Sequence, residues 1–227
     1  VEVVGSGWPS WALTNHDVPR LATRWGGANP PQGLLRVAAA IQMSLRGSPC
    51  LYQGDELGLP EADVAYEDLQ DPYGITMWPE FKGRDGCRTP MPWVSTDPKL
   101  GFSGSATAAK PWLPVSEAHR PLAVDVQEKQ SDSLLSFYRQ LLQWRKSQPV
   151  LLHGDTALLP ADEQVLAYVR THESKKILCV FNLSESAVDW SLPAGVVLGE
   201  LLTQSGLKGA EVKGSKIHLA PWGGMFA

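Results

Sequence analysis

The stretch GLLRVAAAIQMSLRG, residues 33–47, sets the organisation of the first half of the chain. Its apolar residues recur at intervals of three and four, which places them on one face of a helix. Gly47 follows the last of them, at a position where helices commonly end. The pattern predicts an amphipathic helix over residues 32–46, whose apolar stripe is formed by Leu34, Val37, Ala38, Ile41 and Leu45.

Short apolar segments flank this predicted helix on both sides. The segment WPSWALTN, residues 8–15, ends where the polar sequence NHD, residues 15–17, begins. The second segment, residues 49–53, ends shortly before Asp55 and Glu56. A strand, a helix and a second strand in this order are typical of a parallel sheet, whose functional groups gather at the carboxyl ends of the strands. We therefore predict an α/β arrangement with polar groups at one edge of the sheet.

A long segment without regular pattern, residues 59–129, follows the second predicted strand. It is rich in Pro, Gly, Asp and Trp, and loops of this length in compact domains are usually functional or disordered. Trp78, Trp93 and Trp112 lie within it. These side chains predict an ordered loop that aromatic residues pin in place.

Helical periodicity returns in SDSLLSFYRQLLQWRKS, residues 131–147, where Ser131 or Asp132 is placed to cap the helix. Further along, short β-prone segments alternate with polar or glycine-containing turns, which is typical of an antiparallel sheet or sandwich. We predict an α/β domain over residues 1–149 and an antiparallel β domain over residues 150–227. The β-prone segments are QVLAYVR (164–170), KKILCVFNLS (175–184), AVDWSLP (187–193) and SKIHLAP (215–221).

The charge balance is mildly acidic, with a formal net charge of -4, a pI near 5.7 and no cluster of Lys and Arg. This removes the usual electrostatic basis for binding nucleic acid or an anionic membrane, and a neutral substrate fits better. No apolar run approaches the ~20 residues needed to cross a bilayer, and the first residues lack the order of a signal peptide. We predict a protein that binds neither nucleic acid nor membrane.

The three cysteines, Cys50, Cys87 and Cys179, are far apart in the sequence. Because there is no CxxC pair and no Cys/His ligand spacing, the sequence predicts neither a disulfide framework nor a metal site. Cysteine usage of this kind is typical of a reducing compartment, so we predict a cytoplasmic protein, and we assign no cofactor. A strand-like segment begins almost at Val1, which indicates that further chain precedes it.

Carboxylates follow both predicted strands, with Asp17 after the first and Asp55 and Glu56 after the second. Two carboxylates about 5–9 Å apart are what glycoside hydrolysis requires, so this pairing is one hypothesis for the site. The alternative is structural, and Glu56 then pairs with an arginine to support the fold. His16 also has two interpretations, as a functional imidazole or as a half-buried one held by the backbone.

Three motifs in order closely resemble the α-amylase superfamily, glycoside hydrolase family 13. They are ALTNHDVPR (12–20), GSPCLYQGDELG (47–58) and DPYGITMWPEFKGRDGCRTPMPW (71–93). Within the superfamily they are most similar to exo-acting bacterial α-glucosidases and oligo-1,6-glucosidases. The resemblance continues through SLLSFYRQLLQWRKSQPVLLHGD (133–155) and covers essentially the whole chain. It implies the last part of a (β/α)8 TIM barrel, strands 7 and 8 with their helices and the long loop, followed by an antiparallel β-sandwich domain.

The resemblance also implies roles for individual residues. Asp17 matches the carboxylate that stabilises the transition state by holding the 2- and 3-hydroxyls of the sugar, and His16 matches the imidazole that hydrogen-bonds the same sugar. Arg84 looks like the arginine that pairs with an aspartate from an early strand and reaches the 4-hydroxyl of a terminal glucose. The positions that match supporting residues of the family site are Arg20, Glu56 and Arg88.

Two essential groups of the family have no match in this chain. In the family, the nucleophilic aspartate of a GxRxD block and the acid/base glutamate both precede the NHD motif. The resemblance therefore implies the C-terminal portion of a retaining α-glucosidase that is inactive alone. Its partners would be the missing N-terminal part of the barrel and a small α-glucoside or oligosaccharide. Linkage preference and oligomeric state stay open.

Two alternatives remain beside this interpretation. A transglucosylase or isomerase of the same superfamily differs from a hydrolase mainly in residues upstream of the NHD motif. A non-catalytic relative, such as the ectodomain of an amino-acid transporter heavy chain or another interaction scaffold, is the second. The presence of His16, Asp17 and Arg84 together argues against a scaffold, which does not need groups that hold a sugar.

Overall fold

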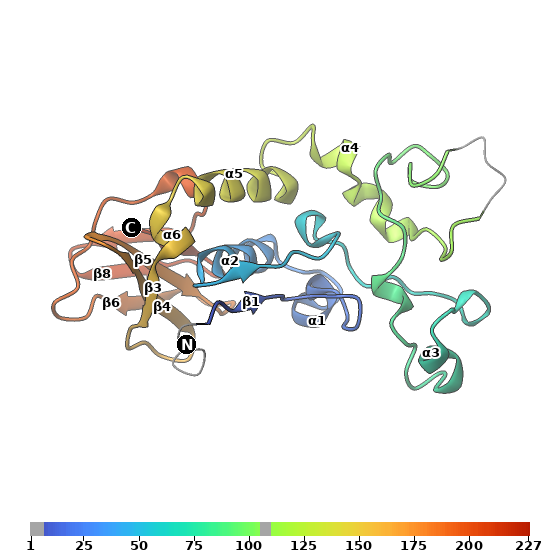
Figure 1. The fold of residues 1–227 in the computed structure, drawn as a ribbon, viewed down its shortest axis with the longest axis horizontal. Helices are drawn as coiled ribbons and strands as arrows, with labels where there is room; N and C mark the ends of the chain where they lie inside the picture. Colours follow the sequence, from blue (N-terminus) through green and yellow to red (C-terminus); the bar gives the residue numbers. More distant parts are fainter. Residues whose placement is uncertain (1–6, 105–109) are drawn as a thin grey trace. The chain divides into compact units, whose positions relative to one another are not determined.

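The computed structural model describes residues 7–104 and 110–227 (Figure 1). The strand-like segment predicted at the start of the chain lies outside these residues. Contacts group the chain into two units that interleave along the sequence. We call the first the β unit; it comprises the chain up to Trp11, Pro31–Cys50 and Phe137–Ala227. We call the second the loop unit; it comprises Ala12–Pro30 and Leu51–Ser136.

A helix between two parallel strands organises the start of the β unit, as the sequence predicts. The helix α2, Gln32–Ser44, ends two residues before the predicted end because Leu45 adopts an extended conformation, with ψ at 152°. The strand β1, Ser10–Trp11, pairs in parallel with β2, Ser48–Pro49. Both strands are shorter than the apolar segments that predicted them, and Pro49 has no N–H with which to extend the ladder.

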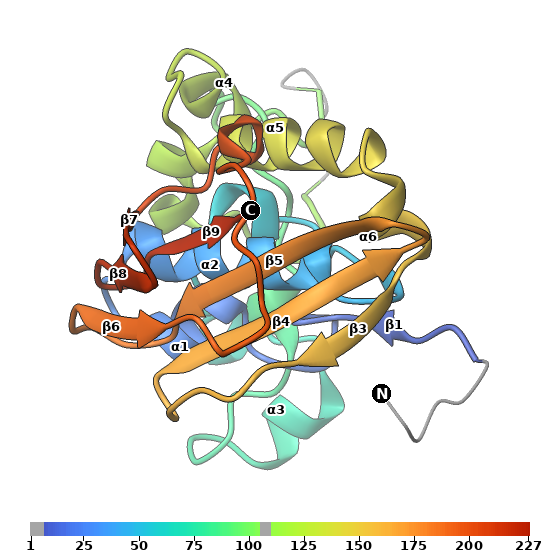
Figure 2. The same ribbon diagram turned by 90° about the vertical axis from the view of Figure 1, so that its left-hand side faces the viewer.

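The C-terminal part of the chain forms two antiparallel sheets (Figure 2). One has the strand order β3-β4-β5-β9 and the other β6-β8-β7. All four predicted segments form strands. Three further strands, β3, β7 and β9, were not predicted, because their sequences DTAL, AEVK and GMF contain few of the residues that favour strands. The predicted domain boundary between residues 149 and 150 stays a prediction. The bounds are β3 Asp155–Leu158, β4 Val165–His172, β5 Lys175–Asn182, β6 Val188–Ser191, β7 Ala210–Lys213, β8 Lys216–Leu219 and β9 Gly224–Phe226.

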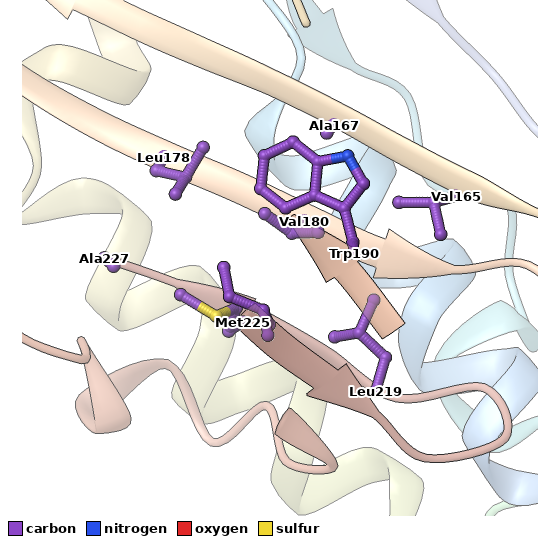
Figure 3. Packing of buried hydrophobic residues seen from close by; sticks show 9 residues of the cluster. Val165, Ala167, Leu178, Val180, Trp190, Leu219, Met225 and Ala227 are labelled. Atoms are coloured by element: carbon purple, nitrogen blue, oxygen red, sulfur yellow. The ribbon is translucent and has the colours of Figure 1, made fainter. Parts of the chain in front are cut away.

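Side chains from both sheets share one apolar core (Figure 3). Trp190 of β6 lies among residues of β4 and β5, and its indole N–H donates to the carbonyl of Pro160 at 3.1 Å. Burying each large apolar side chain stabilises the fold by roughly 1.5–3 kcal/mol. The two sheets therefore form the predicted β-sandwich. Its buried residues are Val165, Ala167, Leu178, Val180, Trp190, Ile217, Leu219, Met225 and Ala227.

The loop unit holds the long segment predicted to lack regular structure. In the described part of residues 59–129 the structure contains only short helices and helical turns. Trp78 packs against a buried cluster and pins the loop, as predicted. Trp93 and Trp112 are 49% and 63% exposed, so the prediction that they pin the loop is wrong. The elements are α1 Leu21–Gly26, α3 Pro72–Thr76, α4 Val124–Gln127 and the 3-10 turns Asp55–Leu57, Tyr66–Asp68, Asp85–Cys87 and Glu117–Leu122.

The second predicted helix, α5, runs over Leu134–Lys146 and is followed by α6, Pro149–His153. Its N-cap is Ser133, whose hydroxyl oxygen accepts the backbone N–H of Ser136 at 3.1 Å. The sequence predicted Ser131 or Asp132 for this role. Ser133 takes it because a capping side chain must precede the first helical residue directly to reach the free N–H groups.

Two buried arginines complete the C-terminal end of α2. Arg145 of α5 donates to the carbonyl of Met43 at 2.7 Å. Arg170 of β4 donates to the carbonyl of Ser44 and, at 2.6 Å, to that of Gly154. The last carbonyls of a helix lack partners within the helix and carry partial negative charge, so cations suit them. The end of α2 is therefore completed by residues far along the chain.

Replacing Arg170 with methionine tests this arrangement. Arg170→Met keeps an unbranched side chain but leaves the carbonyls of Ser44 and Gly154 without their donors. Because an unsatisfied buried polar group costs about 1–3 kcal/mol, we expect the free energy of unfolding in urea to fall by roughly 2–4 kcal/mol. Lys176→Met, at an exposed position on the neighbouring strand β5, is the matched control and should shift it by less than about 0.5 kcal/mol. Equal effects of the two variants would contradict the assignment.

Candidate active site

The NHD segment follows β1 and presents two polar side chains to solvent. The backbone N–H of Asp17 donates to the side-chain oxygen of Asn15 at 2.8 Å, which closes a tight turn. The side chain of His16 is 67% exposed and that of Asp17 is 49% exposed. The turn thus holds an imidazole and a carboxylate at the surface of the loop unit.

Two arginines from the GRDGCR sequence contact the Asp17 carboxylate. Arg84 Nη1 lies 2.9 Å from Asp17 Oδ1, and Arg88 Nη2 lies 3.2 Å from the same oxygen. His16 Nε2 lies 3.4 Å from the other oxygen, Oδ2. Arg88 Nε also donates to the backbone carbonyl of His16 at 2.8 Å. The structure therefore brings together four of the predicted site residues, although the arginines follow Asp17 by 67 and 71 positions.

A residue that the sequence analysis missed, Asp71, is the main partner of Arg84. Arg84 Nε and Nη2 donate to the two oxygens of Asp71 at 2.8 and 2.9 Å, and the backbone N–H of Arg84 donates to Oδ2 at 2.8 Å. The aspartate from an early strand that the resemblance implies as a partner of Arg84 stays a prediction. The neighbouring Arg84 guanidinium holds the pKa of the Asp71 carboxyl well below its usual range. The sequence Asp71-Pro72 does signal a helix N-cap, but it does not signal an arginine partner.

Arg20 lies buried beneath the NHD turn and joins three segments. Its Nη1 donates to the carbonyl of Gln53 at 2.7 Å, and its Nη2 donates to the carbonyl of Cys87 at 2.9 Å. The Tyr52 hydroxyl donates to the same Cys87 carbonyl at 3.0 Å. The NHDVPR, YQGDE and GRDGCR sequences are thus tied together under the exposed side chains. This geometry fits the supporting role predicted for Arg20.

Asp55 and Glu56 face their own segments of the loop unit. Both Asp55 oxygens lie 2.5 Å from the Thr14 hydroxyl, and Oδ2 also accepts the backbone N–H of Tyr52 at 3.2 Å. Glu56 accepts the backbone N–H of Gly54 at 2.8 Å, where the structural alternative expected an arginine. Burial raises the pKa of both carboxyls. These contacts favour a supporting role over a catalytic pairing with Asp17.

Within residues 7–104 and 110–227, no group of three or more His, Cys, Asp or Glu side chains is placed to hold a metal ion. Over the same ranges, none of the helices has both the length and the apolar character that crossing a membrane requires. The cluster around Asp17 is therefore the main candidate for chemistry in the described part of the chain.

Comparison with protein families identifies the family to which this fold belongs. Residues 2–154 match the catalytic domain of alpha amylase, and residues 156–225 match the C-terminal domain of maltogenic amylase. Because the first match covers more than half of the 227 residues, the chain belongs to the α-amylase family. It comprises part of the catalytic domain followed by the antiparallel β domain.

Curated relatives extend beyond the length of this chain. A probable alpha-glucosidase of Rhizobium meliloti (strain 1021) is 45% identical over 222 residues, which are 97% of this chain and 39% of that protein. An oligo-1,6-glucosidase of Parageobacillus thermoglucosidasius is 29% identical, over 97% of this chain and 42% of that protein. The chain thus spans about two fifths of the length of the relatives that it matches.

Similar solved structures are also longer than this chain. The alpha-glucosyl transfer enzyme XgtA has a TM-score of 0.90 and 48% identity, covering 97% of this chain and 40% of that one. A mutant of the trehalulose synthase MutB has a TM-score of 0.84 and 27% identity, covering 99% of this chain and 44% of that one. The similarity therefore includes enzymes named for transfer as well as glucosidases.

The close approach of Gly54 to Arg20 supplies a test of the support beneath the site. Gly54 has φ +92°, and a Cβ there would lie 2.5 Å from Arg20 Nη1 and 2.7 Å from Leu59 Cδ1. Gly27 also has a positive φ, +65°, but a Cβ there would meet nothing within 4 Å. We expect Gly27→Ala to cost about 1–2 kcal/mol of unfolding free energy from backbone strain, and Gly54→Ala to cost at least about 1 kcal/mol more. Thermal unfolding of both variants checks this, and equal losses would show that Arg20 is not tightly enclosed.

Proposed function

We propose that this chain is the C-terminal part of a retaining α-glucosidase that releases terminal α-linked glucose from short oligosaccharides. The observation that carries the proposal is the exposed Asp17 carboxylate, held on one oxygen by Arg84 and Arg88 beside the exposed His16. In retaining hydrolysis an aspartate attacks the anomeric carbon, and water then releases the glucosyl group. We place that aspartate and the acid/base glutamate in the part of the enzyme that completes the barrel. Alone, the 227-residue chain should not turn over substrate.

In this proposal each residue of the cluster has a task. Two arginines contact Asp17 Oδ1, and Oδ2, which lies 3.4 Å from His16 Nε2, is the oxygen that would accept hydrogen bonds from the 2- and 3-hydroxyls of a sugar. Such bonds strengthen as positive charge develops at the anomeric carbon. They therefore lower the free energy of the transition state more than that of the bound ground state. Arg84 uses three of its five side-chain N–H groups on Asp17 and Asp71, and the others remain for the 4-hydroxyl of a terminal glucose. His16 adds a further hydrogen bond to the same sugar.

A glucosyl-transferring enzyme is the second candidate, favoured by the 48% identity to a structure named as an alpha-glucosyl transfer enzyme. Hydrolysis and transfer share the first step and differ in whether water or a sugar hydroxyl accepts the glucosyl group. Product analysis with maltose as substrate separates them, because a hydrolase yields glucose alone whereas a transferase also yields longer or rearranged sugars.

The free cysteines described in the structure fit a cytoplasmic location, which we include in the proposal.

The activity of the complete enzyme tests the role of Asp17. We expect Asp17→Asn in that enzyme to lower kcat/KM for p-nitrophenyl α-glucoside by roughly 10²- to 10³-fold, because a charged acceptor becomes a neutral one. Asp162→Asn, at an exposed position in the β unit, is the control and should keep wild-type turnover. Wild-type turnover in Asp17→Asn would rule out the assigned role. Activity of the purified 227-residue chain that Asp17→Asn abolishes would show that it needs no further part of the barrel.

A further inference from the structure

We propose that Asp71 is a positioning residue that restricts Arg84 to one oxygen of Asp17 and so keeps the other oxygen free for the sugar. The inference rests on the proposed function, because it assigns a task within the same site. Asp71 itself need not touch the substrate. It acts on the substrate only through the orientation that it gives to Arg84.

The contacts of Asp71 and Arg84 fix the guanidinium in position and in plane. The Asp71 side chain is fully buried, with 0% exposure, whereas that of Arg84 is 28% exposed. Two parallel N–H···O bonds join them, and the backbone N–H of Arg84 adds a third donor to the same carboxylate. The ring of Tyr73 lies against the guanidinium, with Arg84 Cζ 5.1 Å from its centroid. What remains directed at Asp17 is the single nitrogen Nη1.

Asp71 is in turn held by its surroundings. The buried carboxylate of Asp85 accepts the backbone N–H groups of Gln70 and Asp71, at 2.6 and 2.7 Å. Gly83 packs so closely that a Cβ there would lie 3.0 Å from Asp71 Oδ2 and 2.8 Å from the backbone of Gly74. The backbone at Asp71 is therefore held by Asp85, and the chain at Gly83 lies close to the Asp71 carboxylate.

The chemistry of arginine explains why such a restraint matters. A guanidinium prefers to bind a carboxylate through two parallel hydrogen bonds, and those bonds are the strongest that it makes. Without Asp71, the best partner for Arg84 within the cluster is Asp17, through both of its oxygens. That contact would occupy Oδ2, which the sugar hydroxyls need. Asp71 opposes it because it fixes the guanidinium through Nε and Nη2, and in that position the contact with Asp17 is made by Nη1 to Oδ1.

Kinetics of Asp71→Asn in the complete enzyme test the proposal, with p-nitrophenyl α-glucoside as substrate. The variant keeps the shape of the side chain and removes its charge. We expect KM to rise and kcat/KM to fall by roughly 10- to 100-fold, because Arg84 then competes with the sugar for Asp17. Asp63→Asn is the matched control, since it removes an exposed carboxylate that pairs with Lys82 at 2.6 Å in the same loop, and it should leave both constants unchanged.

A double-mutant cycle separates positioning from general support. In an Arg84→Gln background no arginine is left to position, so adding Asp71→Asn should change kcat/KM by less than about 2-fold. A further 10-fold loss in that background would overturn the proposal, because the loss would then come from the fold. The same comparison decides the case if Asp71→Asn alone does not fold, since the double variant carries no unpaired charge.

A crystal structure of the Asp71→Asn variant of the complete enzyme gives a readout that does not depend on activity. We expect Arg84 to contact both oxygens of Asp17, and an Arg84 that keeps its single contact would overturn the proposal. If the wild-type enzyme releases no p-nitrophenol, the proposed function fails, and the crystal structure still decides the role of Asp71. If the wild type is active and Asp71→Asn matches it, only the present inference fails.

Discussion

The guanidinium of Arg20 must be surrounded by oxygen atoms, because it is buried and carries a permanent charge. The carbonyls of Gln53 and Cys87 accept hydrogen bonds from its Nη1 and Nη2, and they come from two different segments. Their backbones must therefore approach the NHDVPR turn closely, and Gly54 makes room for the approach. Arg20, three positions after Asp17, thus anchors the turn whose other side chains, His16 and Asp17, are exposed.

Carboxylates of similar sequence context have different properties here because their surroundings differ. Asp17 is half-exposed, two arginines contact its Oδ1, and His16 lies 3.4 Å from its Oδ2. Asp55 and Glu56 are largely removed from water and accept hydrogen bonds from neighbouring residues, and burial raises the pKa of their carboxyls. Asp71 is buried as well, yet a neighbouring arginine lowers the pKa of its carboxyl. Environment, more than residue type, separates a ligand-facing acid from a supporting one.

Local patterns predicted most of the architecture, because helices and strands depend on periodicities within a few residues. The helix predicted at 32–46 appears as Gln32–Ser44, and the parallel strands beside it and the four predicted antiparallel segments also appear in the structure. The site was less accessible from local pattern. His16 and Asp17 were candidates because of their place after a predicted strand, whereas Arg84 was found through resemblance to a family. Asp71 was missed because its partner lies 13 positions away with no spacing rule between them. The exposure of Trp93 and Trp112 was also not predicted, because composition does not say which other residues cover a side chain.

The end of α2 has a consequence for how the chain acquires its structure during synthesis. The carbonyls of Met43 and Ser44 receive their donors from Arg145 and Arg170, which leave the ribosome 102 and 126 residues later. A domain that folds from its N-terminus as it emerges cannot complete this helix until the strand that carries Arg170 is made. Contacts over such sequence distances also slow folding, because long loops must close first. The last carbonyls of α2 therefore lack these protein donors until Arg145 and Arg170 have been synthesised. The C-terminal β-sheet thus stabilises an N-terminal helix only late in synthesis.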